Sequence, residues 1–172
     1  DYDNNKIDAF GDAYEFLMGM YASNVGKSGG EYFTPQEVST LLTKLAIIGK
    51  DRVNKVYDPA CGSGNFLTET YISLRRLENE ILTELYSNGQ ILMDMTGDAK
   101  VIHVSIGQFY GIVINDFAVT VAKTALWIAE SQMMKATEDI VHMELDFLPL
   151  KSYANIVEAN ALRIDWNTVI SK

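Results

Sequence analysis

The sequence predicts an α/β fold, built on a mostly parallel, doubly wound sheet. Three observations lead to this class. A glycine turn, DPACGSG, follows the apolar run VNKVYD and precedes a helical pattern. Two further apolar runs, GQFYGIVI and NIVEANAL, are separated by another helical pattern. The resulting order of strand, turn, helix, strand, helix and strand is typical of doubly wound sheets. A chain of 172 residues, 48% of them hydrophobic, is long enough for one compact domain.

Residues 1–50 are predicted to form a helical segment ahead of the sheet. Apolar residues recur at a spacing of three and four between positions 7 and 21, which indicates an amphipathic helix. The glycine-containing stretch SNVGKSGGEYF ends that pattern. A second helix is predicted to begin at Thr34, with Pro35 in the first helical position and Glu37 completing a capping box, and to end near Ile48.

Residues 51–172 are predicted to hold the sheet domain itself. After the glycine turn, one apolar stripe predicts a long helix; its members are Leu67, Tyr71, Leu74, Leu77, Ile81 and Leu85. Residues 86–106 are interpreted as an irregular insertion or a hairpin. Asp116 is expected to cap the next helix. The buried face of that helix is expected to include Ala122, Ala125, Ala129 and Met133.

Charge and composition exclude several classes of protein. The net charge of -9 argues against a free-standing nucleic-acid binder, so any contact with DNA needs positive charge from other parts or partners. The single cysteine cannot form an internal disulfide, and His103 and His142 offer no metal-ligand spacing. No apolar run approaches membrane-spanning length, and the start, DYDNNKIDAF, lacks the order of a signal peptide. We therefore expect a soluble cytoplasmic protein with no membrane partner and no metal.

The glycine turn is the first candidate site. Asp58 closes a strand and two glycines follow, so backbone amides can approach a nucleotide-like ligand at the carboxyl ends of the strands. A tight turn with a capping aspartate is the alternative. A dinucleotide fingerprint needs a glycine where the chain has Leu67, and a P-loop needs a lysine after Gly64. Cys61 is a third candidate, as a nucleophile, but the local sequence names no base for it.

Two motifs carry a resemblance to a known family. DPACGSGNF resembles the S-adenosylmethionine-binding motif of amino-methylating DNA methyltransferases, and GGEYFTPQEVSTLL looks like the other cofactor-contacting motif of that family. Residues 1–64 are similar to the modification subunit of type I restriction systems. Residues 65–172 look closer to the large single-chain adenine methyltransferases. The sequence leaves open whether this mosaic is natural or engineered.

The resemblance implies a fold, a cofactor and partners. The fold is a truncated, Rossmann-like class I methyltransferase domain with an N-terminal helical extension, and the cofactor is S-adenosylmethionine. In the full-length protein the partners are DNA and specificity and restriction subunits, or fused domains that replace them. The activity implied is DNA adenine-N6 methylation, although nothing in the motifs themselves distinguishes it from cytosine-N4 methylation.

The resemblance also implies site residues. In the upstream motif they are Glu31, Tyr32, Phe33, Thr34, Pro35 and Gln36, with Thr34 near the carboxylate of the cofactor. A helix N-terminus suits such a carboxylate, because its exposed amides attract anions. In the glycine turn the implied residues are Asp58, Ala60, Cys61, Gly62, Ser63 and Gly64. Asn160 takes the place of the residue that binds the adenine edge, and a loop asparagine bonded to its own backbone is the alternative.

The chain departs from the family pattern at the second strand. The family usually carries GIEIN, whose acid binds both ribose hydroxyls, but this chain carries GIVIN. Val113 cannot accept a hydrogen bond, and a lost charge-assisted pair is worth roughly 1.5 to 3 kcal/mol. We therefore expect weak cofactor binding that Val113→Glu strengthens. Asp116 is a possible substitute acid, if it does not cap the following helix.

The catalytic motif of the family is also absent. That motif is Asn or Asp, two prolines, and Tyr or Phe, which hold a flipped-out base for methyl transfer. The three prolines of this chain, Pro35, Pro59 and Pro149, are not adjacent. We expect a cofactor-binding fragment without catalytic residues, inactive alone. A non-catalytic scaffold and a nucleotide-dependent oxidoreductase are the competing hypotheses.

Overall fold

The computed structural model describes residues 34–87, 102–142 and 154–170, together with positions 13, 16, 17, 20 and 145. The first elements are α2 (Gln36–Ile47), β1 (Val56–Asp58) and α3 (Asn65–Ser87). They are followed by a 3-10 turn (Ile106–Gln108), β2 (Phe109–Val113), α4 (Asp116–Val141), β3 (Asn155–Glu158) and α5 (Asn167–Ile170). Most of the helix predicted over residues 7–21 lies outside the described residues, as does the middle of the insertion predicted over residues 86–106.

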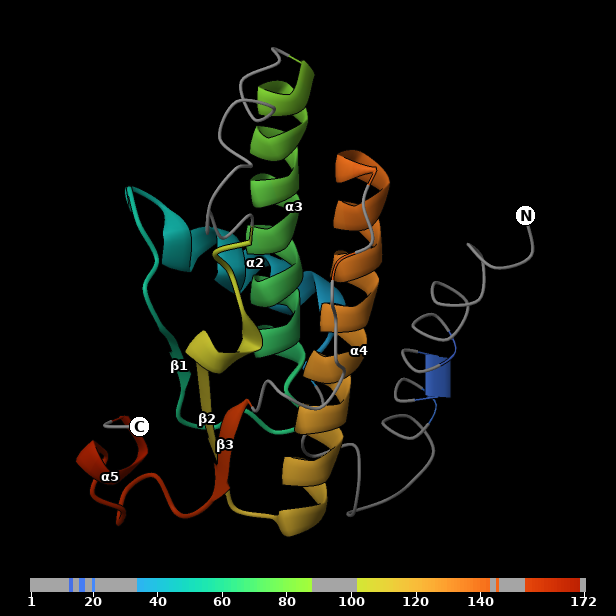
Figure 1. Cartoon of the computed structure of the whole chain (residues 1–172). Coiled ribbons are helices and arrows are strands. Elements are labelled where there is room, and N and C mark those ends of the chain that lie inside the picture. Colours follow the sequence, from blue (N-terminus) through green and yellow to red (C-terminus); the bar gives the residue numbers. More distant parts are fainter. Residues whose placement is uncertain are drawn as a thin grey trace.

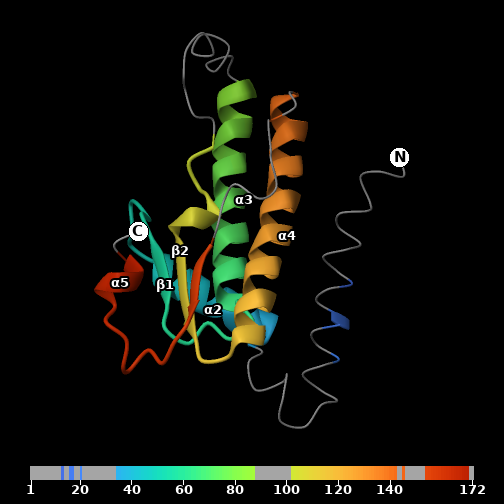
Figure 2. The same cartoon turned by 60° about the horizontal axis from the view of Figure 1, so that its bottom comes forward.

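The strands form a parallel sheet in the order β1-β2-β3, as Figure 1 shows. Each predicted apolar run contains one of them, so the predicted parallel α/β arrangement is confirmed. The helices α3 and α4 lie side by side on one face of the sheet, and the short α5 lies on the other (Figure 2). Coverage of both faces by long helices, as in a complete doubly wound fold, therefore stays a prediction.

The core lies between the sheet and the two long helices. Strand residues alternate between faces, and Phe109 and Val113 of β2 belong to the same buried cluster as Leu67 and Tyr71 of α3. The predicted buried face of α4 is confirmed, since Ala122, Ala125 and Ala129 are buried and Met133 packs against the core. These small side chains let α4 lie close to the turn that follows β1. No helix within the described residues has the length and apolarity needed to cross a membrane.

The apolar stripe predicted for α3 is correct only near its start. Leu67 and Tyr71 are fully buried, but Leu77 and Ile81 are each 52% exposed. The buried residues of the second half are Arg75, Asn79 and Leu82, so that face is largely polar. Arg75, which is fully buried, pairs with Glu78 and donates a hydrogen bond to Thr137 of α4. The spacing of apolar residues predicts one face of the helix as buried, but in the second half of α3 the face packed against α4 is the neighbouring one, which carries Arg75.

Both predicted helix caps are wrong by one residue. The helix α2 begins at Gln36 with Pro35 as its N-cap and no side-chain capping bond, so the capping box from Thr34 is absent. The helix α4 is capped by Asn115, whose side chain accepts a hydrogen bond from the amide of Ala118 at 3.3 Å. Asp116 is the first helical residue and contributes an acid to the first turn. Asparagine and aspartate are equally good caps, so the local sequence does not decide between them.

The helix α2 packs through its polar side. Its buried residues are Ser39 and Thr43, and the Thr43 hydroxyl lies 2.9 Å from the Thr70 hydroxyl of α3. The opposite side is apolar and exposed, with Val38, Leu41, Leu42 and Leu45. Hydrogen bonds therefore hold this helix against α3, and they fix the start of α2 relative to the turn after β1.

Candidate functional site

The glycine turn is tied to the second strand by backbone hydrogen bonds. The amide of Cys61 donates to the carbonyl oxygen of Ile112 at 3.1 Å. The amide of Ala60 donates to Oδ1 of Asp58 at 3.0 Å, so the capping aspartate that was named as the alternative for this turn is present. The amide of Gly64 then donates to the carbonyl oxygen of Cys61 at 2.7 Å. The turn therefore has a fixed shape at the carboxyl end of β1, where ligands of parallel sheets bind.

Glycine is required at three positions around this turn. Gly62 and Gly64 have φ of 51° and 84°, a conformation that side chains rarely adopt. A Cβ on Gly64 would lie 2.8 Å from the Cβ of Ala122 in α4. A Cβ on Gly111 would lie 2.7 Å from Sγ of Cys61. These contacts show that the turn lies directly against β2 and α4, with no room for larger residues.

The environment of Cys61 argues against a catalytic thiol. Its side chain is buried against Gly111 and Leu67. Burial and the nearby charge of Asp58 raise the pKa of the Cys61 thiol to about 12. A nucleophilic cysteine needs a depressed pKa, so this side chain serves packing. Burial also raises the pKa of Asp58, although the hydrogen bond from the Ala60 amide opposes that shift.

Asn65 joins the two motifs that the sequence singles out. Its Nδ2 donates to the carbonyl oxygen of Thr34 at 2.9 Å, and its Oδ1 accepts a hydrogen bond from Oγ of Ser63 at 2.6 Å. Thr34 stands just before α2, and Ser63 belongs to the glycine turn. The structure therefore brings the two motifs into contact although they are far apart in sequence. Sequence reasoning missed Asn65, because its partner in the first motif is a backbone carbonyl that leaves no sequence signal.

The other predicted site residues have varied surroundings. Glu31, Tyr32 and Phe33 lie outside the described residues. Pro35 caps α2, and the side-chain amide of Gln36 donates to the carboxylate of Glu69 in α3. The Oδ1 atom of Asn160 accepts a hydrogen bond from the amide of Leu162 at 3.0 Å, which is the backbone-bonded arrangement named as the alternative. Its role toward an adenine ring stays a prediction.

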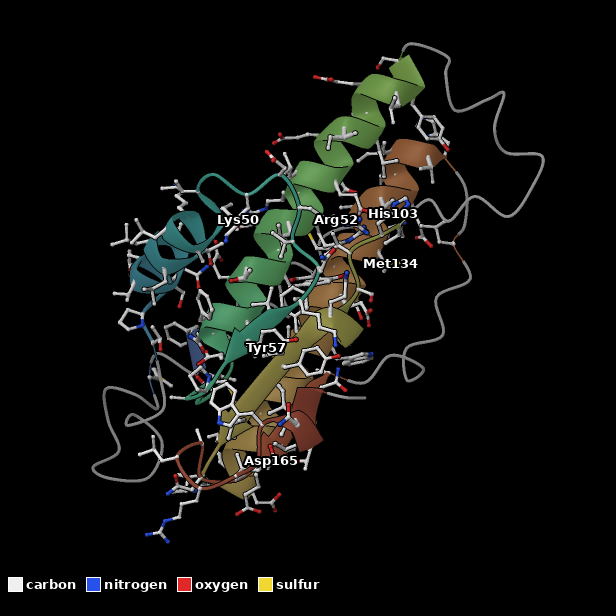
Figure 3. The ribbon with its side chains drawn as sticks, turned by 90° about the vertical axis from the view of Figure 1, so that its left-hand side faces the viewer. Lys50, Arg52, Tyr57, His103, Met134 and Asp165 are labelled. Atoms are coloured by element: carbon white, nitrogen blue, oxygen red, sulfur yellow. The ribbon has the colours of Figure 1, made fainter. Side chains whose placement is uncertain are left out.

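Two large cavities lie at the opposite end of the sheet. Their volumes are about 410 and 490 Å³, and both are lined by Lys50, Arg52, Lys55 and Val56. Figure 3 shows Lys50, Arg52 and His103 toward one end of the molecule and Asp165 toward the other. Val56 and Phe109 begin their strands, so the first cavity is at the amino ends.

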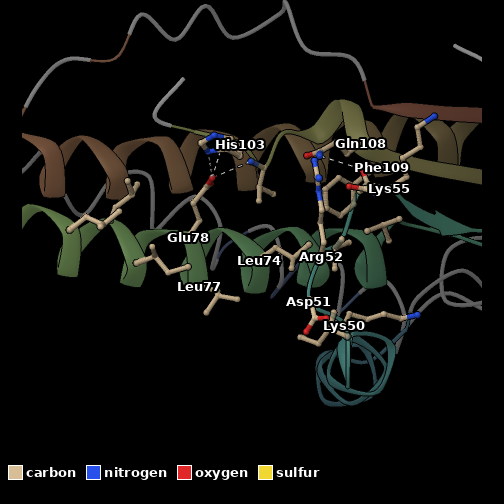
Figure 4. A pocket seen from close by; sticks show the side chains of 18 residues that line it. Lys50, Asp51, Arg52, Lys55, Leu74, Leu77, Glu78, His103, Gln108 and Phe109 are labelled. Carbon is tan, nitrogen blue, oxygen red and sulfur yellow. Dashed lines mark hydrogen bonds and ion pairs between the residues drawn. The ribbon is translucent and has the colours of Figure 1, made fainter. Parts of the chain in front are cut away.

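The first cavity is lined partly by residues of α3. Figure 4 shows Leu74 and Leu77 of α3 on one wall, with Glu78 bonded to the chain at His103. The amide of His103 donates to Oε1 of Glu78 at 2.6 Å. Neither large cavity is lined by a predicted site residue. Ligands of parallel sheets bind at the carboxyl ends of the strands. We therefore assign the candidate site to the glycine turn and not to the two cavities at the amino ends.

Comparison with known proteins identifies the family. The family model for the MmeI DNA-methyltransferase domain matches residues 34–172, from Thr34 within the upstream motif through all three strands. The chain belongs to the MmeI DNA-methyltransferase domain family. The predicted resemblance to methyltransferases of restriction-modification systems is thereby confirmed.

Relatives of this chain include named DNA methyltransferases and restriction-modification enzymes. The chain is 62% identical to the type I restriction enzyme MpnII methylase subunit of Mycoplasma pneumoniae over 69 residues, or 40% of this chain and 13% of that protein. It is 42% identical to DNA methyltransferase A of Bacillus subtilis over 135 residues, or 77% of this chain and 14% of that protein. The structure of the type IIL restriction-modification enzyme MmeI in complex with DNA matches with a TM-score of 0.59 and 33% identity, covering 94% of this chain and 19% of that one. The MmeI-type domain described here thus spans less than a fifth of each relative's length.

Proposed function

We propose that this chain is the cofactor-binding portion of an S-adenosylmethionine-dependent DNA adenine-N6 methyltransferase from a restriction-modification system. The bridge that Asn65 makes between Thr34 and Ser63 is the observation that carries the proposal. Two segments that resemble cofactor-contacting motifs meet at the carboxyl edge of a parallel sheet. Membership of a DNA-methyltransferase domain family supports methyl transfer as the reaction class.

The residues at this edge fit a sulfonium nucleoside. The absence of a side chain at Gly62 and Gly64 lets a ligand approach the backbone of the turn closely, and the positive φ of both residues sets the shape of that turn. The start of α2, next to Thr34, offers the positive end of a helix dipole to the carboxylate of the cofactor. Asn160 follows β3 and is the proposed contact for adenine. The bound cofactor supplies an activated methyl group, and the residues described hold and orient it.

The DNA-dependent part of the reaction is assigned to other regions of a longer protein. The chain has no pair of adjacent prolines, so it lacks the family's catalytic motif. Its net charge of -9 is unsuited to neutralising DNA phosphates. DNA, together with specificity and restriction subunits or fused domains, is the proposed set of partners of the full-length protein. We propose a cytoplasmic location because such systems act on intracellular DNA.

Binding and turnover test this function separately. Isothermal titration of the chain with S-adenosylmethionine and with S-adenosylhomocysteine is expected to give saturable binding of both. Incubation with methyl-labelled cofactor and an adenine-containing duplex is expected to give no labelled DNA. Absence of binding, and of thermal stabilisation, by both compounds would favour the scaffold hypothesis. A fluorescence titration in which only a nicotinamide cofactor binds would favour an oxidoreductase.

A further inference from the structure

The last residues of β2 and β3 are neighbours at the proposed cofactor edge. In the parallel register, Val113 is paired with Glu158. The amide of Ala159 donates to the carbonyl oxygen of Val113 at 2.9 Å, so this register persists to the end of the strands. Adjacent strands are separated by about 4.8 Å. The side chain of Glu158 therefore starts one strand spacing from that of Val113.

The two side chains also share a face of the sheet. Phe109 and Val113 of β2 belong to the core under the helices, as do Ala154 and Ile156 next to and within β3. Side chains alternate along a strand, so Glu158, two residues after Ile156, lies on this face. The glycine turn lies on the same face, since a Cβ on Gly111 would contact Cys61.

The chemistry of these two positions is complementary. Val113 is 5% exposed and offers no acceptor. Glu158 is exposed and bears a carboxylate. A ribose presents two neighbouring hydroxyl donors, and a carboxylate can accept from both at once through charge-assisted hydrogen bonds. The acid absent from β2 is thus present one strand away.

Three other carboxylates toward this end are less suited. Oδ1 of Asp165 accepts hydrogen bonds from the amide and the side chain of Asn167. Oδ1 of Asp58 already accepts the amide of Ala60, which shapes the glycine turn. Asp116 stands in the first turn of α4, after the cap residue Asn115. There its negative charge is stabilised by the positive end of the helix dipole. Glu158, in contrast, ends its strand directly beside Val113.

The geometry points to Glu158 as the residue that binds the ribose hydroxyls of the adenosyl group, in place of the acid missing at position 113. This inference rests on the proposed function and adds a specificity-determining residue to it. In this chain the ribose is then bound by a residue at the end of β3, because position 113 at the end of β2 has no acid. A consequence is that a carboxylate restored at position 113 competes with Glu158 for the same hydroxyls.

Titration with S-adenosylhomocysteine tests this assignment. Glu158→Gln is expected to weaken binding about 10- to 100-fold, the loss typical of a charge-assisted pair. Glu84→Gln, which removes an exposed carboxylate from α3, is the matched charge control and is expected to leave affinity unchanged. Asp116→Asn tests the rival acid. Thermal melting of each variant verifies that it is folded, which is expected because Glu158 is exposed.

Two further readouts are specific to the ribose. The wild-type chain is expected to prefer adenosine to 2′,3′-dideoxyadenosine in competition, and Glu158→Gln is expected to lose that preference. Val113→Glu is expected to restore affinity in the Glu158→Gln background and to add less in the wild type, where two carboxylates on paired positions repel each other.

The possible results separate the inference from the proposed function. A wild-type chain that binds no S-adenosylhomocysteine overturns both. A wild-type chain that binds it, with equal affinity in Glu158→Gln, overturns the ribose assignment and leaves the function standing. Loss of binding in Asp116→Asn, but not in Glu158→Gln, likewise overturns the assignment in favour of Asp116.

Discussion

Gly64→Ala is the substitution that most directly perturbs the glycine turn. Gly64 has φ of 84°, and an added Cβ would lie 2.8 Å from the Cβ and 3.0 Å from the Cα of Ala122. The left-handed conformation costs a non-glycine residue about 1–2 kcal/mol. Overpacking against a helix backbone adds about 1–3 kcal/mol. Gly64→Ala is therefore expected to lower the free energy of unfolding by about 2–5 kcal/mol.

Two other glycines separate these causes. Gly49 has φ of 67° with nothing within 4 Å of its added Cβ, so Gly49→Ala is expected to cost only the conformational part, about 1–2 kcal/mol. Gly111 lies in β2 and would meet Sγ of Cys61 at 2.7 Å, so Gly111→Ala is expected to cost only the packing part, about 1–3 kcal/mol. Cys61→Ala removes that sulfur and is expected to relieve part of the cost.

Denaturant unfolding of the variants measures these free energies, and titration with S-adenosylhomocysteine measures the effect on binding. Gly64→Ala is also expected to weaken binding, because the turn must move away from α4. Equal unfolding free energies for Gly64→Ala and Gly49→Ala would refute the close contact between the turn and α4.

Three further predictions follow from the contacts around the site and the core. Asn65→Asp keeps an acceptor for Ser63 but cannot donate to the Thr34 carbonyl, so it is expected to weaken binding of S-adenosylhomocysteine by titration, with unchanged affinity contradicting the bridge. Glu78→Ala leaves the buried Arg75 without its carboxylate and is expected to cost about 3–5 kcal/mol in denaturant unfolding. Arg75→Met in the same chain should recover much of that loss. The Cys61 thiol has a pKa of about 12 when folded against an ordinary 9.0, so stability is expected to fall as pH rises from 9 toward 12, less so in Cys61→Ala. Rapid labelling of native Cys61 by a thiol reagent at pH 8 would contradict its burial.

The order of the elements could be predicted from the sequence because it depends on local patterns. Apolar runs located the three strands, and the glycine turn separated the first strand from its helix. The caps were missed by one residue because Asn115 and Asp116 are both good capping residues. At α2, the cap was predicted at Thr34, but the observed N-cap residue is Pro35. Which of two adjacent candidates caps a helix depends on the path of the chain before it.

Contacts between distant segments could not be predicted in this way. The apolar stripe of α3 failed at Leu77 and Ile81, because the contact with α4 uses Arg75 and Thr137 instead. The inward face of α2 is polar, which reverses the usual rule that the apolar face is buried. The role inferred for Glu158 depends on strand register, which only the folded sheet defines.

The central claim is that the start of α2 and the glycine turn together bind one S-adenosylmethionine molecule. A crystal structure of the chain with S-adenosylhomocysteine tests it most directly. We predict density between Thr34 and Gly62, with the amino-acid carboxylate toward the start of α2 and the ribose toward Glu158. Density bound elsewhere, such as in the cavities near Lys50, or no density from a ligand-saturated crystal, would contradict it.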